Sequence, residues 1–175
     1  MPLIRDDGIT SHPWRLAEPD EPLELRGHII VPLERLDDAL DAQAGGPLGV
    51  ALPNTADAVS LVPHFAALDL ITIAFPGFAD GRGFSLAKRL RAAGYEGELW
   101  AEGRLIADQY AFARSCGFDS VLVDDAVFQR QPEPEWLEAA ASMSPAYQSS
   151  VEQWAAGPRS ILELRRGRLQ SLAAE

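Results

Sequence analysis

The sequence predicts an α/β fold in which about five mostly parallel strands alternate with helices. Three observations predict it: short apolar, β-branched runs recur along the chain, a segment with helical spacing follows most of them, and the connections are short. Such alternation is typical of parallel strands joined by right-handed crossovers. The repeat of roughly 20–25 residues fits a partial TIM-barrel-like sheet or an open doubly wound sheet, and about five strands are too few for a complete barrel.

Residues 1–27 are predicted to form a small N-terminal hairpin or arm. Asp7-Gly8 is a turn signal between two short apolar pieces. Trp14 is expected to pack back on the body of the protein, and Pro19 and Pro22 bracket an acidic connector. The α/β domain is therefore expected to span residues 28–148.

The strands are predicted from apolar runs. The third run, DLITIAFP, is the clearest, because it is apolar without alternation and is therefore expected to be buried on both faces. The predicted strands span residues 28–33, 49–53, 69–76, 97–103 and 120–125.

Caps and breakers mark the predicted helices. Thr55 or Asp57 is the expected cap of the second helix, which Pro63 divides, and Ser85 is the expected cap of the third, which Gly94 ends. The predicted helices of the domain span residues 33–43, 55–68, 84–94 and 105–117, followed by a proline-started helix over 131–143.

The C-terminal stretch, 149–175, is predicted to be a helical extension. A short helix is expected near 146–154, and the last stretch is predicted to be either a docking helix or a frayed tail. Between Arg159 and Arg168 four arginines stand against one glutamate, a pattern that suits an acidic partner.

Composition excludes several classes of function. The net charge of −11 disfavours binding to nucleic acid and to anionic membranes. No apolar run approaches the ~20 residues that span a bilayer, and no signal-peptide pattern is present, so the expected compartment is the cytoplasm. With one cysteine, Cys116, the chain can form neither an internal disulfide nor an iron–sulfur cluster held by its own residues.

Sites in such folds lie at the carboxyl ends of the strands. Polar residues follow every predicted strand, and we expect them to share one rim; Glu34, Arg35, Asn54, Thr55, Asp124 and Asp125 belong to it. The candidate ligand-binding residues on this rim are Asp80, Arg82, Ser85, Glu102, Arg104 and Asp108.

The stretch FPGFADGRGFS, residues 75–85, joins the clearest strand to its helix. Its glycines, the helix start and Arg82 together are able to hold an anion, although Asp80 opposes this. The alternative is a turn that the Asp80–Arg82 pair holds and that caps the helix, which is the commoner role of turn glycines. Two glycine patterns that bind nucleotides, G-x-G-x-x-G and G-x-x-x-x-G-K-[ST], are both absent from the sequence.

Two further groups have a functional and a structural interpretation. Asp124 and Asp125, with Glu102, have the oxygen ligands that Mg²⁺ prefers, but no other ligand pattern supports a metal, and a solvated turn is favoured. Cys116 is either a reactive thiol or a small apolar side chain packing a helix, and its place near a helix end favours packing. No metal site is predicted.

Residues 28–148 resemble a bacterial family of domains of unknown function. The pattern Phe-Pro-x-Phe-x-Asp-Gly-Arg-Gly-[Tyr/Phe]-Ser is followed by Gly-Tyr-x-Gly-Glu-Leu-Arg-Ala-x-Gly, Asp-Gln and Cys-Gly-Phe-Asp. Matching residues are Phe75, Pro76, Phe78, Asp80, Gly81, Arg82, Gly83, Phe84, Ser85, Gly94, Tyr95, Gly97, Glu98, Leu99, Ala101, Gly103, Asp108, Gln109, Cys116, Gly117, Phe118, Asp119, Tyr147 and Gln148. The chain departs from the pattern at Trp100, where the family usually has arginine, and at Arg104, where an acidic residue is common.

The resemblance implies a pathway. Members of the family are encoded beside assimilatory sulfite reductase and are described as oxidoreductases of sulfite reduction, so it implies an accessory protein or an oxidoreductase with a bound flavin or nicotinamide cofactor. Sulfite reductase or its electron donor is the implied partner. The alternatives are a non-catalytic module that docks on the reductase, and a partial-barrel enzyme that binds a phosphate ligand. The family supplies no catalytic residue to carry over.

Overall fold

A computed structural model describes residues 1–18, 27–42 and 46–141. The chain divides into two units, Met1–Ser142 and Met143–Glu175, and the described residues all lie in the first. The predicted C-terminal extension over 149–175 and the helix predicted near 146–154 lie outside the described residues. The boundaries predicted at residues 27 and 148 stay predictions.

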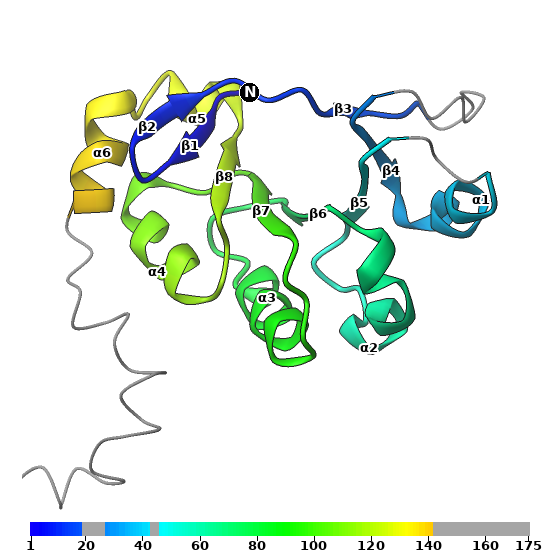
Figure 1. The fold of residues 1–175 in the computed structure, drawn as a ribbon. Coiled ribbons are helices and arrows are strands. Elements are labelled where there is room, and N and C mark those ends of the chain that lie inside the picture. The colour runs from blue at the N-terminus through cyan, green and yellow to red at the C-terminus, as the bar shows by residue number, and fades with distance from the viewer. Residues whose placement is uncertain (19–26, 43–45, 142–175) are drawn as a thin grey trace, which may run out of the picture. The chain divides into compact units, whose positions relative to one another are not determined.

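Among the described residues, eight strands form one sheet in the order β2-β1-β8-β7-β6-β5-β4-β3 (Figure 1). The five strands predicted from apolar runs form its parallel centre. Because consecutive strands are neighbours and the order never reverses, the centre is a curled half barrel and not a doubly wound sheet. These strands are β4 (Ile29–Pro32), β5 (Leu48–Leu52), β6 (Leu70–Phe75), β7 (Glu98–Gly103) and β8 (Ser120–Val123).

Three short strands at the edges make the sheet larger than predicted. β1 (Leu3–Arg5) and β2 (Gly8–Thr10) form the predicted hairpin, and β1 also pairs antiparallel with β8. β3 (Arg15–Leu16) pairs parallel with β4 at the opposite edge. The predicted number of about five strands was therefore wrong, because the predicted hairpin joins the same sheet and β3, with two residues, is too short to carry an apolar run of its own.

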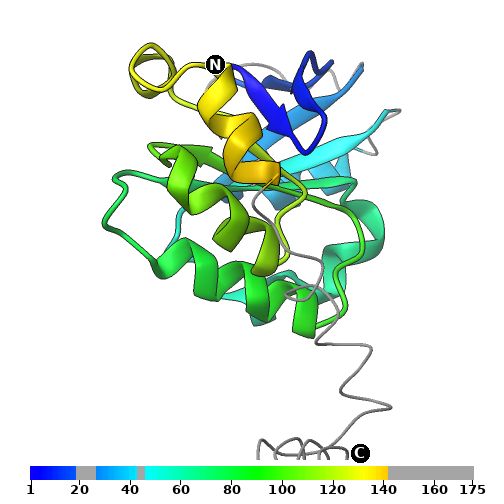
Figure 2. The same cartoon turned by 90° about the vertical axis from the view of Figure 1, so that its left-hand side faces the viewer.

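Helical segments follow the parallel strands, and α2, α3 and α4 lie on one side of the sheet (Figures 1 and 2). α6 packs against α4 and the hairpin strand β2. The segments, with 3₁₀ turns written η, are η1 (Leu33–Arg35), α1 (Leu36–Asp41), α2 (Ala58–Leu61), η2 (Val62–Ala67), α3 (Arg82–Ala92), η3 (Ala107–Gln109), α4 (Tyr110–Ser115), α5 (Asp125–Phe128) and α6 (Glu133–Ala141).

The predicted caps are correct at two positions and wrong at one. The Asp57 carboxylate accepts a hydrogen bond from Val59 N–H at 3.1 Å and caps α2, and Gly94 ends the α3 segment with a φ of 96°. Ser85 is not a cap, because α3 begins three residues earlier, at Arg82. The Asp80 carboxylate accepts from Arg82 N–H at 3.3 Å, which allows the helix to start there.

The two faces of the parallel strands carry different side chains. The face beneath the helices is apolar, and its central residues Ile71, Ile73 and Phe75 are buried. On the opposite face Trp14 packs against a buried cluster, as predicted, while Glu98 and Glu102 add polar groups to that face of β7. The buried cluster consists of Leu3, Ile30, Leu70, Trp100 and Leu122.

Candidate functional site

Asp80 and Arg82 form a closed pair at the carboxyl end of β6. The Asp80 carboxylate accepts hydrogen bonds from Arg82 Nε at 2.9 Å and from Arg82 Nη2 at 2.6 Å, besides the bond from the Arg82 backbone. The Arg82 guanidinium therefore holds the pKa of Asp80 well below its usual range. The carboxylate lies at the start of α3, where a bound anion would lie, so the geometry favours the turn-holding role over anion binding.

Asn54 brings a second strand end to this turn. It follows β5, is 6% exposed, and its amide approaches the Asp80 carboxylate closely enough to lower the pKa of Asp80 further. Asn54 Nδ2 makes no hydrogen bond within the described residues. Asn54 and Asp80 therefore lie near each other after β5 and β6, and the wider rim stays a prediction.

The other four predicted rim residues do not join this pair. Ser85 is exposed on α3, Glu102 is half-buried on β7, and Arg104 is exposed in the loop after β7. Asp108 lines a pocket of about 460 Å³ with Glu135 and Glu138 of α6. In the described ranges no side-chain hydrogen bond or ion pair links these four residues to Asp80 or Arg82, so a shared ligand site stays a prediction.

Packing around Phe75 explains two of the glycines that match the family pattern, Gly83 and Gly103. A Cβ on Gly83 would lie 2.4 Å from the Phe75 ring, and one on Gly103 would lie 2.6 Å from the Phe75 carbonyl oxygen. Gly103 also has a φ of 117°, which side chains rarely adopt. Around Gly81 the nearest such contact is 3.9 Å, so steric exclusion does not require that glycine.

Two large aromatic side chains are exposed beside this turn. Phe78 is 62% exposed and Phe112, on α4, is 51% exposed. Gln109 Nε2 donates to the Phe78 carbonyl at 2.8 Å, which ties the loop to the segment that carries Phe112. The Phe112 ring lies 4.9 Å from the Phe84 ring, which in turn lies 4.9 Å from the Phe75 ring, so a chain of aromatic rings connects the core to the surface. We call Phe78 and Phe112 the aromatic patch.

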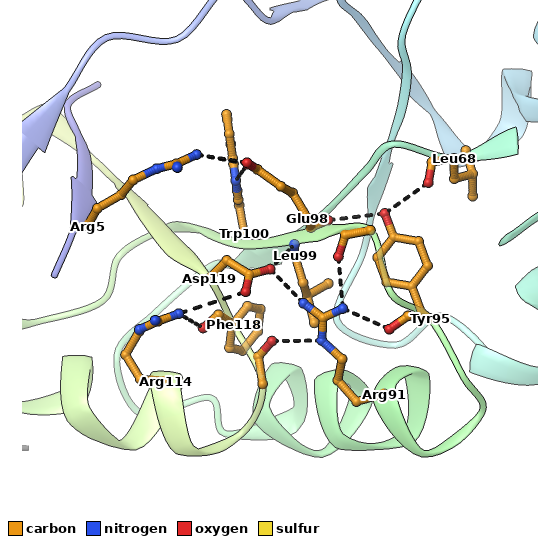
Figure 3. Close-up of polar contacts among 12 residues, drawn as sticks. Arg5, Leu68, Arg91, Tyr95, Glu98, Leu99, Trp100, Arg114, Phe118 and Asp119 are labelled. Carbon is orange, nitrogen blue, oxygen red and sulfur yellow. Dashed lines mark hydrogen bonds and ion pairs between the residues drawn. The ribbon is translucent and has the colours of Figure 1, made fainter. Parts of the chain in front are cut away.

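A second polar cluster lies at the opposite, amino end of the strands (Figure 3). Arg91, in the last turn of α3, donates to the carbonyl oxygens of Gly117, Tyr95 and Gly97 at 2.8–2.9 Å and to the Asp119 carboxylate at 2.6 Å. The same carboxylate accepts from Leu99 N–H at 2.8 Å. Arg91 thus fixes the loops that precede β7 and β8. We call this cluster the amino-end network.

Arg114 extends the network to the hairpin. It donates to both oxygens of Asp6 at 2.7–2.9 Å and to the carbonyl oxygen of Phe118, and Tyr110 donates to Asp6 at 2.8 Å. Burial opposes ionisation of Asp6, but the hydrogen bonds from Arg114 and Tyr110 outweigh it and lower its pKa. Burial, and then Asp6, raise the pKa of Tyr110. These partners are about a hundred residues apart in sequence, so the sequence interpretation missed them.

A model for a bacterial protein of unknown function, DUF934, matches residues 49–156. The chain belongs to this family. No curated protein matches it. The predicted resemblance to a family of unknown function is thereby confirmed, while the link to sulfite reductase stays a prediction. The DUF934 span begins in β5 and contains the Asp80–Arg82 turn, the aromatic patch and Arg91, whereas Arg5 and Asp6 precede it.

The remaining candidates in this DUF934 protein have structural partners. Asp124 caps α5 by accepting from Ala126 N–H at 2.8 Å, and Asp125 pairs with the terminal amine at 2.9 Å. Cys116 is buried, which raises the pKa of its thiol and favours the packing interpretation. In the described ranges no group of three or more metal-ligating side chains is placed to hold a metal ion, and no helix is long and apolar enough to cross a membrane.

Proposed function

We propose that this DUF934 protein is an accessory protein of assimilatory sulfite reduction that docks, in the cytoplasm, on sulfite reductase or on its electron donor. The observation that carries the docking step is the aromatic patch. Phe78 and Phe112 are both more than half exposed, although burying such a ring in an interface is strongly favourable. The proposed pathway rests on the family resemblance. The aromatic patch is the surface with which the protein would bind a partner of that pathway.

The surroundings of the patch fit a binding surface. Phe112 is held by the Phe84 ring and by Lys88, whose Nζ lies 5.7 Å from the Phe112 ring centroid, and Phe78 is tied by its carbonyl to Gln109. Side chains and loops that are already ordered lose less entropy on binding. Large anchors held in place are typical of the residues that dominate protein–protein interfaces.

Two alternatives compete with this proposal. An oxidoreductase with a bound flavin or nicotinamide would use the rim that Asp80 and Asn54 begin, and a partial-barrel enzyme would bind a phosphate at the start of α3. The second receives less support, because the Asp80 carboxylate already accepts Arg82 N–H there. A visible spectrum separates the first from docking, since a flavin band in the purified protein would favour the enzyme.

The docking proposal is tested by size-exclusion chromatography of the protein mixed with purified sulfite reductase and, separately, with the reductase's electron donor. We expect co-elution with one of them, lost in the Phe78→Ser/Phe112→Ser variant. Leu16→Ser is the matched control, because Leu16 is 55% exposed on β3 at the far edge of the sheet. Co-elution with neither protein, or co-elution that survives the double substitution, would contradict the proposal.

A further inference from the structure

The helices α3 and α4 carry no carboxylate, although the chain has a net charge of −11. α3 has four basic side chains and α4 has one. Three of these five cations are held in ion pairs with aspartates; they are Arg82, Arg91 and Arg114. Lys88 and Arg89 are exposed, and neither forms an ion pair within the part of the chain that the structure describes. The two helices therefore present uncompensated positive charge to solvent.

These two cations lie beside the aromatic patch. Lys88 Nζ is 5.7 Å from the centroid of the Phe112 ring, and Arg89 is the next residue of α3. The Phe84 ring of α3 packs against the Phe112 ring at 4.9 Å between centroids, which joins the two helices at this point. α3 and α4 lie on the same side of the sheet (Figures 1 and 2). We call Lys88 and Arg89 the cationic border of the patch.

The cationic border acts over a short range. At an ionic strength of about 0.15 M the Debye length is about 8 Å, so a group that touches the border is attracted to it more than it is repelled by distant carboxylates of the chain. Nucleic acid and anionic membranes extend well beyond that distance, and the net charge of −11 repels them. A compact protein with a few carboxylates at the contact avoids most of this repulsion. The charges therefore favour an acidic patch on a protein as the occupant of this surface.

We propose that the docking partner presents carboxylates beside an apolar pocket. The pocket receives Phe78 and Phe112, and the carboxylates pair with the cationic border. This inference rests on the proposed function and adds to it the chemistry of the partner's surface. An apolar centre with a polar rim is the usual anatomy of protein interfaces, and charges at the rim speed association and exclude wrong partners.

The test is the affinity of the full chain, by isothermal titration calorimetry at about 0.15 M salt, for whichever of sulfite reductase and its electron donor co-elutes with it. Arg89→Glu should weaken binding by about tenfold. Arg130→Glu is the matched control and should weaken it by less than about twofold. It changes the net charge equally, and Arg130 is exposed just after α5, which lies away from α3 in both views (Figures 1 and 2). Equal affinities of the two variants would overturn the inference and leave docking through the aromatic patch intact.

Binding of neither protein would contradict the proposed function, and a synthetic peptide then tests the inference alone. In this peptide Leu-Phe is flanked by three glutamates on each side, and the backbone amide shifts of the isotope-labelled full chain are followed by NMR. We expect amides of α3 and α4 to shift, with a dissociation constant of about 1 mM, and Arg89→Glu to reduce the shifts. The same peptide with lysines in place of the glutamates should leave these amides unchanged. No shift in α3 and α4 with the glutamate peptide, or equal shifts with both peptides, would overturn the inference.

Discussion

The turn at the carboxyl end of β6 and the amino-end network both pair arginine with aspartate, but they differ in reach. Asp80 and Arg82 are two residues apart, and 61% of the Arg82 side chain is exposed. Arg91 and Asp119 are 28 residues apart, and only 25% of the Arg91 side chain is exposed. The first pair shapes one turn, whereas the second closes loops that belong to different βα units. The difference indicates that the amino end carries stability and leaves the carboxyl end available for contacts, as in barrel folds generally.

The largest expected effect is the loss of Arg91. Arg91→Met removes the donors of three backbone carbonyls and leaves the partly buried Asp119 carboxylate short of a partner. We expect it to lower the free energy of unfolding by about 3 kcal/mol, measured by urea denaturation. Arg89→Met, on an exposed position of the same helix, should change it by less than about 0.5 kcal/mol. A similar loss in both variants would remove the distinction between the two regions.

A smaller loss is expected from Gly83→Ala. The new methyl group would lie 2.4 Å from the Phe75 ring, so core rings must shift, at a cost of about 1–3 kcal/mol. Gly81→Ala, where the nearest contact is 3.9 Å, should be neutral or slightly stabilising. Thermal or urea unfolding of the two variants measures the difference in stability. A Gly83→Ala protein as stable as the unmodified one would show that glycine is not needed there for packing.

Asp6 is expected to make stability depend on pH in the acid range. Its folded-state pKa lies below the unfolded value of about 3.9, so its contribution is present above that value and is lost as the pH falls through the folded-state pKa. Because 47% of the Asp6 side chain is exposed, solvent screening limits the contribution to about 1 kcal/mol at pH 7.

Urea denaturation of Asp6→Asn between neutral pH and about pH 3 checks this expectation. The difference from the unmodified protein should shrink as the pH falls. Asp7→Asn, an exposed neighbour, is the control and should show almost no difference at any pH. A difference that stays constant with pH would exclude ionisation of Asp6 as its cause.

The smallest effect is expected at the exposed pair. Arg82→Met should leave the urea midpoint within experimental error, because solvent competes for both charges of a surface ion pair. Inorganic phosphate should not raise the melting temperature of the unmodified protein, since Asp80 already lies at the start of α3. A phosphate-dependent rise that Arg82→Ala abolishes would instead favour the phosphate-ligand enzyme.

The sequence predicted the parts of the fold that local physics controls. Each of the five strands from β4 to β8 carries an apolar run, and Asp57 and Gly94 act where their chemistry places them. Ser85 was misassigned because the helix begins earlier, with Gly81 at the N-cap position and the preceding Asp80 carboxylate accepting from Arg82 N–H. Local signals of equal strength cannot be ranked without the backbone geometry.

Much of the candidate site could not be predicted in this way. Asp80 and Arg82 were identified because they are close in sequence. The amino-end network was missed, since Asp6 meets Arg114 only after the hairpin joins β8. The position of Arg91 in the last turn of a helix, where arginine often binds backbone carbonyls, was a usable signal. The exposure of Phe78 and Phe112 was not predicted, although Phe78 lies in the predicted turn after the third strand, and turns run over the surface.

The most direct test of the division between the two regions is the affinity of the aromatic-patch variant for its partner, measured by calorimetry alongside its urea unfolding. Phe78→Ser/Phe112→Ser should bind sulfite reductase or its electron donor at least about a hundredfold more weakly than the unmodified protein does, with a smaller loss of stability than Arg91→Met shows. Arg91→Met should be less stable in urea, and at temperatures where it stays folded it should bind the partner as tightly as the unmodified protein does. Unchanged affinity in the folded double variant would contradict the account.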